Sequence, residues 1–163
     1  MPARQRAERQ TVRTTSARRF QPFFISFLVC LADQVTKLFV VCFFTPGESR
    51  AVIPPVFYLT YVQNIGAAFG LFKGQQWLFL ACSIVVSGWI IRELIRQEKL
   101  AALTAASYAL VLGGAAGNLI DRVRLGFVID FLDFRVWPVF NIGDSAITVG
   151  IALLIWHSLF SKP

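Results

Sequence analysis

The sequence predicts an all-α membrane protein with four transmembrane helices and a small β-structure outside the membrane. Its composition is 56% hydrophobic and only 15% charged, and its mean hydropathy is +0.61. Soluble globular proteins carry about 25% charged residues, so this deficit indicates a membrane protein. Four apolar runs approach the roughly 18 residues that span a bilayer as a helix. With 163 residues, the chain has room for one domain.

Charged or turn-forming segments separate the four runs. The runs cover about Phe20–Phe44, Gly74–Ile91, Leu100–Ile120 and Ser145–Ser161. The first run is too long for the apolar part of a removable signal peptide and it carries charges, so we expect it to remain as a helix. Gly113 and Gly117 on the third run have the GxxxG spacing that favours close helix packing.

The region between the first two runs is apolar but is not predicted to be helical. It reads AVIPPVFYLTYVQNIGAAFGLF, in which two adjacent prolines and the Gln63–Asn64 pair argue against a helix. Its centre, VFYLTYV, is rich in β-branched and aromatic residues, which favours a strand. Because an open strand edge cannot face lipid, we expect this strand to lie outside the hydrocarbon.

Basic residues predict how the chain crosses the membrane. Residues 1–22 contain six arginines and one glutamate, and residues 92–99 are also basic. The positive-inside rule therefore places both segments and both termini in the cytoplasm, with residues 45–73 and 121–144 outside. The basic arm, residues 1–22, is expected to touch anionic lipid. No base-reading motif accompanies it, so nucleic-acid binding is not indicated.

The cysteines and the histidine form no recognisable site in the sequence. Cys30, Cys42 and Cys82 lie inside apolar runs without metal-ligand spacing, and they are predicted to be small buried hydrophobic residues. His157 lies near the end of the last run and is predicted to be a packed or interfacial histidine. Catalysis by a Ser-His-Asp set, a Cys-His pair or zinc is therefore not indicated.

Four of the five aspartates lie in the predicted outer segment or at its ends. Asp130 lies in a strand-like stretch, GFVIDF, and Asp144 opens the fourth helix within FNIGDSA. Two carboxyl groups held together at low dielectric constant share a proton, so that one activates water while the other donates to a carbonyl oxygen. Asp133 is an alternative partner for Asp130. Asn141 or Asp144 could instead serve only as a helix cap.

Other polar residues keep more than one interpretation. Asp33 and Lys37, four apart on the first helix, form either a structural ion pair or a substrate-side pair. The glycine-rich NIGAAFG, residues 64–70, is either an ordinary turn or a backbone turn that binds a peptide. Asp121 is predicted to pair with its neighbour Arg122 and hold the loop.

Two other function classes are compatible with these carboxylates. A membrane lipid phosphatase would hold Mg²⁺ with Asp121, Asp130 and Asp133. A small proton-coupled carrier would use Asp33 and Lys37 as its coupling pair. Both explain fewer of the motifs than the paired carboxyl groups of an aspartic protease.

Four motifs follow one another in a specific order: DQVTK, NIGAAFG, GNLIDRVRLGFVIDF and FNIGDSAITVG. Together they resemble the lipoprotein signal peptidases, or type II signal peptidases, of bacteria. The resemblance covers residues 24–160, and the basic arm lies outside it. It implies a single membrane peptidase domain, residues 23–160, with a β-cradle at about 46–73 and a catalytic loop at about 117–144.

The resemblance also implies an activity. It is that of an intramembrane aspartyl endopeptidase of the bacterial cytoplasmic membrane, with its active site on the extracytoplasmic side. Such an enzyme removes signal peptides from diacylglyceryl-modified prolipoproteins by cleavage just before the lipidated cysteine. The resemblance further implies that globomycin-type inhibitors block the pair of aspartates. We expect no metal or other cofactor, and nothing in the sequence requires more than a monomer.

Carried over by motif, the catalytic pair falls on Asp130 and Asp144. The residues that bind substrate or shape the site are Asn64, Gly66, Asn118, Arg122, Asn141, Asp33 and Lys37. The sequence departs from the family pattern in two places. Gly143 stands where alanine is common, and the loop between the two aspartates is short compared with several members.

Overall fold

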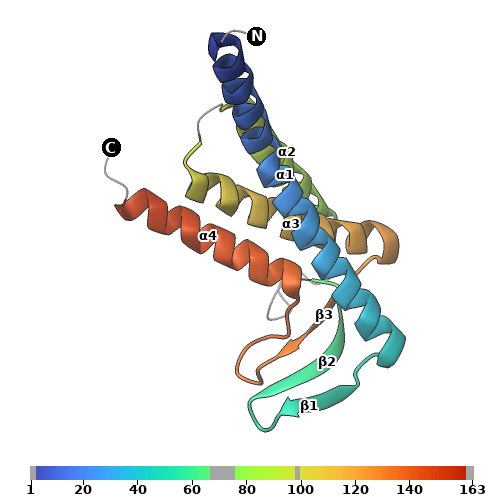
Figure 1. Ribbon diagram of the computed structural model, residues 1–163. Coiled ribbons are helices and arrows are strands. Elements are labelled where there is room, and N and C mark those ends of the chain that lie inside the picture. Colours follow the sequence, from blue (N-terminus) through green and yellow to red (C-terminus); the bar gives the residue numbers. More distant parts are fainter. Residues whose placement is uncertain (1–2, 67–75, 98–99, 161–163) are drawn as a thin grey trace.

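The computed structural model describes residues 3–66, 76–97 and 100–160. It contains four helices (Figure 1), namely α1 (Ala3–Phe43), α2 (Gln76–Arg96), α3 (Ala102–Leu125) and α4 (Ile142–Phe160). Each includes a stretch long and apolar enough to cross a membrane, which confirms the four predicted spans. The side of the membrane on which the termini lie stays a prediction.

All four helices extend beyond one end of the predicted apolar runs, among them α1 at its start and α3 at its end. α1 begins at Ala3, so the backbone of the basic arm is helical and continuous with the first span. α3 continues past Asp121 to Leu125 and is closed by Gly126, which has a φ of 80° and donates its N–H to the Arg122 carbonyl. Glycine adopts this left-handed conformation without steric cost. The first part of the predicted catalytic loop, about residues 117–144, is therefore the C-terminal part of α3.

A three-stranded antiparallel sheet lies at one end of the helices (Figure 1). Its strands are β1 (Ser49–Ile53), β2 (Phe57–Asn64) and β3 (Val128–Asp133), in the order β1-β2-β3. β2 confirms the strand predicted in VFYLTYV. Asp130 of β3 pairs with Val62 of β2, so the chain after α3 lies beside the chain after α1. Of the predicted β-cradle, residues 67–73 lie outside the described residues.

α3 is the central helix of the bundle. Of its membrane window 50% is buried, compared with 11% in α2 and in α4. A Cβ on Gly113 would lie 2.6 Å from the Ser26 carbonyl oxygen of α1, and a Cβ on Gly117 would collide with the Asp33 carboxylate. The two glycines of the GxxxG spacing thus form a close contact between α3 and α1, and the missing side chain at Gly117 leaves room for the buried Asp33 carboxylate.

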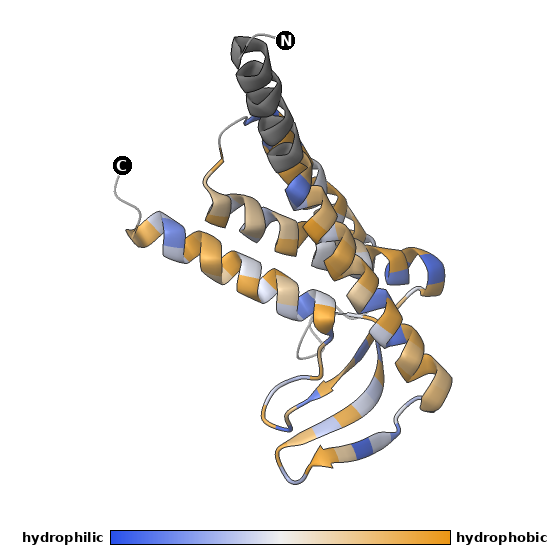
Figure 2. Cartoon of the chain, in the orientation of Figure 1, coloured by the Kyte–Doolittle hydropathy of each residue, from blue (hydrophilic) through white to orange (hydrophobic). Residues whose placement is uncertain are grey.

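A hydrophobic cluster joins the sheet to the C-terminal end of α1. Its buried members are Val40, Phe44, Tyr61, Ile129 and Phe131. Fully burying one aliphatic or aromatic side chain stabilises a fold by roughly 1.5–3 kcal/mol, so this cluster fixes β3 against α1. Figure 2 shows mostly hydrophobic helices, with several hydrophilic residues where the helices meet the sheet.

The predicted burial of the cysteines is wrong for two of the three. Cys42 and Cys82 are exposed on the protein surface, and Cys30 is half-buried. Their apolar neighbours in sequence are themselves exposed along the same helices, as Val41 and Ile84 illustrate. Lipid can cover such faces, so an apolar run in a membrane helix does not report burial within the protein.

Candidate active site

Two asparagines link the predicted catalytic aspartates. Asn141 donates one amide hydrogen to Asp130 Oδ1 over 2.6 Å and the other to Asn118 Oδ1 over 3.1 Å. Asn118 in turn donates to Asp144 Oδ1 over 2.7 Å. β3, α3 and the start of α4 thus each contribute to one hydrogen-bonded chain, which runs from Asp130 to Asp144.

Asn141 also caps α4. Its Oδ1 accepts the backbone N–H of Asp144 over 2.8 Å, and its carbonyl accepts the N–H of Ser145. This is the N-cap geometry in which a side-chain oxygen satisfies an otherwise unpaired helical donor. The predicted cap is therefore confirmed, and the same side chain also contacts Asp130 through its nitrogen. The role of Asn141 in binding substrate or shaping the site stays a prediction.

The second oxygen of Asp130 is held by Asn64. Asn64 donates to Asp130 Oδ2 over 2.8 Å and accepts the backbone N–H of Gly66 over 3.0 Å. Asn64 and Gly66 of NIGAAFG thus reach the site, whereas residues 67–70 of that motif lie outside the described residues. Both oxygens of Asp130 accept a hydrogen bond, which fixes the orientation of this carboxyl group.

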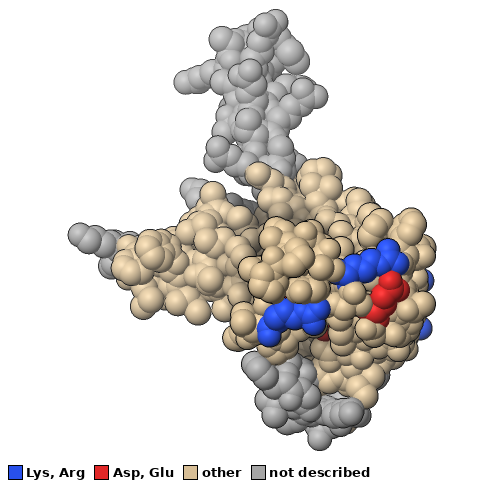
Figure 3. All heavy atoms as spheres, turned by 90° about the horizontal axis from the view of Figure 1, so that it is seen from below, with Lys and Arg blue, Asp and Glu red and all other residues tan. Residues whose placement is uncertain are grey.

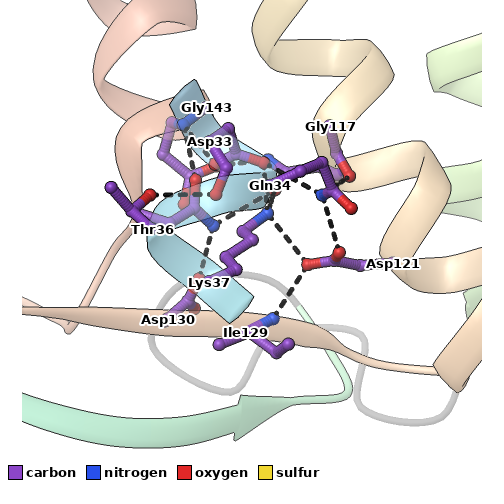
Figure 4. A network of polar contacts seen from close by, with 12 residues as sticks. Asp33, Gln34, Thr36, Lys37, Gly117, Asp121, Ile129, Asp130 and Gly143 are labelled. Carbon is purple, nitrogen blue, oxygen red and sulfur yellow. Dashed lines mark hydrogen bonds and ion pairs between the residues drawn. The ribbon is translucent and has the colours of Figure 1, made fainter. Parts of the chain in front are cut away.

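Lys37 is a buried cation beside the hydrogen-bonded chain that joins Asp130 to Asp144, and its side chain points towards Asp121 (Figure 4). Its Nζ is 2.8 Å from an oxygen of Asp33 and 2.8 Å from an oxygen of Asp121. It also donates to Asn118 Oδ1 over 2.8 Å. All four side chains are buried. The Asp33–Lys37 pair is thus real, and it extends by one hydrogen bond to the amide that holds Asp144.

Both carboxylates that bind Lys37 also anchor backbone at the site (Figure 4). Asp33 Oδ1 accepts the N–H of Gly143 over 2.8 Å, and Asp121 Oδ2 accepts the N–H of Ile129 over 3.1 Å. Gly143 directly precedes Asp144, and Ile129 directly precedes Asp130. One lysine therefore connects the backbone positions from which both aspartates project.

The predicted Asp121–Arg122 pair is wrong. Asp121 forms its ion pair with Lys37, because residues adjacent on a helix point in different directions. Sequence reasoning also missed Gln34, which donates to Asp121 Oδ1 over 2.9 Å and to the Gly117 carbonyl over 3.1 Å. Its place within DQVTK, between Asp33 and Lys37, was the available signal.

Arg122 lies at the edge of the site and Asp133 lies outside it. The Arg122 guanidinium donates weakly to the Asn118 carbonyl over 3.4 Å and lies over the Phe79 ring, 5.3 Å from its centroid. Asp133 accepts from Thr60 Oγ1 over 2.7 Å and pairs with Arg135. The alternative pairing of Asp130 with Asp133 therefore receives no support from these contacts.

Asp130 has an unusual protonation equilibrium. Burial and the nearby Asp144 carboxyl raise the pKa of Asp130 to about 7, although hydrogen bonds from Asn64 and Asn141 and the charge of Lys37 act in the opposite direction. A carboxyl group with such a pKa retains a proton near neutral pH. The pair can therefore hold one proton under physiological conditions.

The magnesium arrangement considered from the sequence is not present in the described residues. No group of three His, Cys, Asp or Glu side chains in that part of the chain is placed to hold a metal ion. Asp121 is committed to Lys37 and Asp133 to Thr60 and Arg135, so the three carboxylates proposed for Mg²⁺ have separate partners.

Comparison with known proteins identifies the family. The sequence profile of the signal peptidase (SPase) II family matches residues 25–160. The chain belongs to the signal peptidase II family. A lipoprotein signal peptidase of Halothermothrix orenii is 44% identical over 135 residues, which are 83% of this chain and 92% of the relative. One of Syntrophomonas wolfei subsp. wolfei is 49% identical over 129 residues, 78% of this chain and 85% of the relative.

Two solved structures, each described as a bacterial membrane enzyme determined by the in meso method, share the fold of this signal peptidase II chain. The one at 2.3 Å resolution has a TM-score of 0.80 and 33% identity, and the match covers 85% of this chain and 87% of the other. The one at 1.9 Å has a TM-score of 0.79 and 32% identity, with coverage of 87% and 94%. The four-helix architecture with its small sheet is therefore that of a known membrane enzyme.

Proposed function

We propose that this chain is an aspartyl endopeptidase that removes signal peptides from diacylglyceryl-modified prolipoproteins by cleavage just before the lipidated cysteine. The relatives named lipoprotein signal peptidase support the substrate class. The hydrogen-bonded chain from Asp130 through Asn141 and Asn118 to Asp144 carries the proposed chemistry. The bacterial cytoplasmic membrane is the proposed location, with the site on the extracytoplasmic side.

The two carboxyl groups divide the work of activating water. Asp130, with a raised pKa, keeps the proton and donates it to the carbonyl oxygen of the scissile peptide bond. Asp144 is the base. Asn118 occupies its Oδ1, and its Oδ2 has no partner among the described residues, so that oxygen is placed to take a proton from water.

The proton transfers then run in reverse to release the products. The water oxygen bonds to the carbonyl carbon and forms a diol, while the amides of Asn64 and Asn141 keep the Asp130 carboxyl group in its orientation. The C–N bond breaks as Asp144 returns its proton to the leaving amine. Asp130 recovers a proton from the diol as the new carboxyl group forms. Water and the two carboxyl groups suffice, so the proposed route requires no metal or other cofactor.

The position of the site suits a lipid-anchored substrate. Asp144 lies in the first turn of α4 and Asp130 lies on a strand beside the bundle, so the pair sits where a membrane helix ends. A substrate whose diacylglycerol stays in the bilayer presents its peptide bond at that depth. Burial of Asp130 excludes bulk water and sustains its raised pKa.

The proposal is tested by cleavage of a diacylglyceryl-modified prolipoprotein by purified protein in detergent, with EDTA present. Asp130→Asn and Asp144→Asn are each expected to reduce the rate by roughly 10²–10⁴-fold, the usual contribution of general acid–base catalysis. Asp133→Asn is the matched control, since it removes a carboxylate from the same strand but outside the chain of amides. Thermal unfolding verifies that each variant is folded.

The outcomes separate the parts of the proposal. The proposal is supported if the wild type and Asp133→Asn cleave the substrate, if globomycin blocks this cleavage, and if Asp130→Asn and Asp144→Asn do not cleave. Near-normal cleavage by Asp130→Asn or by Asp144→Asn contradicts the assignment of the pair. Failure of the folded wild type to cleave several such substrates contradicts the substrate class.

A further inference from the structure

Exposed aliphatic and aromatic side chains gather on the sheet, away from the bundle. They lie at the end of β1, in the turn between β1 and β2 and in the loop after β3, and we call them the apolar platform. Its members are Val52, Ile53, Val56, Val136 and Trp137, with exposed fractions of 51%, 60%, 57%, 90% and 61%. Such a patch in contact with water marks an interaction site.

The two segments of the platform lie side by side. Tyr58 of β2 pairs with Asp133 of β3, so the β1–β2 turn and the loop after β3 leave the sheet at the same end. The rings of Phe57 and Phe134 confirm this contact, with centroids 4.9 Å apart. Phe134 also stacks on Phe140, at 6.0 Å, just before α4 begins. The platform is therefore continuous with the end of a membrane helix.

The platform carries almost no charge. Residues 51–60 contain no charged residue, and residues 134–140 contain only Arg135. Arg135 is neutralised by Asp133 at 3.5 Å, donates to Ser49 Oγ over 2.8 Å, and lies 3.7 Å from the centroid of the Tyr58 ring. Figure 3, which views the molecule from the sheet side, shows few charged groups on the described surface.

We infer that the apolar platform rests in the interfacial region of the lipid bilayer, in the leaflet where α4 begins. The free energy falls when the apolar atoms of valine, isoleucine and tryptophan side chains leave water. Tryptophan is also favoured at the level of the lipid headgroups. The continuity with α4 places the platform within reach of that layer. This inference depends on membrane insertion of the four helices and not on the proposed chemistry.

Lipid fits the platform better than a peptide does. Val52 and Ile53 end the edge strand β1, whereas Val56, Val136 and Trp137 lie beyond the strands. An extended peptide paired along β1 would therefore leave the larger part of the platform uncovered. Its members Val136 and Trp137 also follow the end of β3 at Asp133, which is three residues beyond Asp130, or roughly 10 Å at 3.3 Å per residue. Contact with lipid at this distance would hold the sheet, and with it Asp130, at a constant depth.

Spin labelling of the full chain in phospholipid vesicles tests this inference. The three native cysteines are replaced by alanine, and a nitroxide is attached to Ile53→Cys, Val136→Cys or Arg50→Cys. Arg50 is the matched control because it lies on β1 and is exposed as Ile53 is, but it is charged and pairs with Glu48. Collisions with oxygen, which partitions into lipid, are compared with collisions with a water-soluble nickel chelate.

Labels at positions 53 and 136 are expected to show a several-fold higher ratio of oxygen to nickel collisions than the label at position 50. Equal ratios at all three positions would overturn the inference, because the platform would then stand in water. Protection of positions 53 and 136 from nickel only after addition of a prolipoprotein would also overturn it, because the substrate would then be the occupant. Substitutions at such exposed positions usually change stability by less than about 0.5 kcal/mol, so folding is retained.

Discussion

At the scale of single residues, the order of the site depends on Lys37. This one buried cation pairs with two buried carboxylates, Asp33 and Asp121. Those carboxylates hold the N–H groups of Gly143 and Ile129, next to the two proposed catalytic residues. The bundle therefore uses a buried ion cluster to position groups that make no direct contact with the lysine.

Replacement of Lys37 by methionine should destabilise the protein strongly. The substitution leaves two buried carboxylates without a cation, and breaking a buried ion pair in this way costs about 3–5 kcal/mol. Arg50→Met is the control, because it removes a cation from an exposed pair with Glu48, where about 0–1 kcal/mol is expected. Thermal unfolding in detergent compares the two, and equal shifts would contradict the structural role of Lys37.

The pH dependence of cleavage should reveal the proton on Asp130. Because the proposed acid must be protonated, and the pKa of Asp130 is raised to about 7, the rate should fall as pH rises through about 7. Measurement of kcat/KM between pH 5 and 9 tests this. Asp133→Asn should keep the same profile, since Asp133 lies outside the pair. A rate that rises from pH 7 to 9 would exclude Asp130 as the acid.

Sequence reasoning at this scale identified the polar residues but not all of their partners. The motifs pointed to Asp130, Asp144, Asn118 and Asn141, and the structure joins these four in one chain. The partner of Asp121 was predicted incorrectly. A buried charge pairs with whichever opposite charge the packing of helices brings near, and that is a property of contacts distant in sequence.

At the scale of elements, α3 and α4 approach each other closely through two glycines. A Cβ on Gly143 would lie 2.9 Å from the Gly114 carbonyl oxygen and 3.1 Å from the side-chain oxygens of Asn141 and Asp33. A Cβ on Gly114 would collide with the Gly143 carbonyl. Gly143 thus fits a tight contact at the start of α4.

Alanine substitutions should distinguish these glycines. Gly114→Ala should destabilise the protein by about 1–3 kcal/mol, the usual cost of overpacking, with a smaller effect of the same sign for Gly143→Ala. Gly88→Ala on α2 is the control, because a Cβ there would meet no atom within 4 Å. It should stabilise the helix by up to about 1 kcal/mol. Unfolding temperatures in detergent measure all three, and a stabilising Gly114→Ala would refute the close contact.

The elements differ in how well local sequence predicts them. The helices follow from apolar runs of membrane length, and β2 follows from its β-branched and aromatic composition. β1 and β3 were not assigned as strands of a sheet from the sequence, although a strand-like stretch was noted around Asp130. Strand pairing is decided by partners distant along the chain, here Val62 with Asp130, and composition does not report such partners.

At the scale of the whole molecule, the described network of the site lies well beyond the basic arm in the sequence. Every described contact of the network comes from residues between Asp33 and Asp144, and the family profile begins at residue 25. Deletion of residues 1–19 should therefore leave kcat/KM in detergent unchanged. The full-length chain is the control in the same assay. Loss of activity by a folded, shortened protein would show that the arm contributes to the site.

The sequence by itself determined the fold class, the four spans and the family. The length of an apolar run and the order of motifs are local properties, which can be recognised without knowledge of contacts. It also indicated the two aspartates. Only the tertiary structure decided that Lys37 lies between Asp33 and Asp121, and that Asn118 and Asn141 join Asp130 to Asp144. These contacts connect α1, β3, α3 and α4, and their energies depend on burial and distance, which only the packed bundle defines.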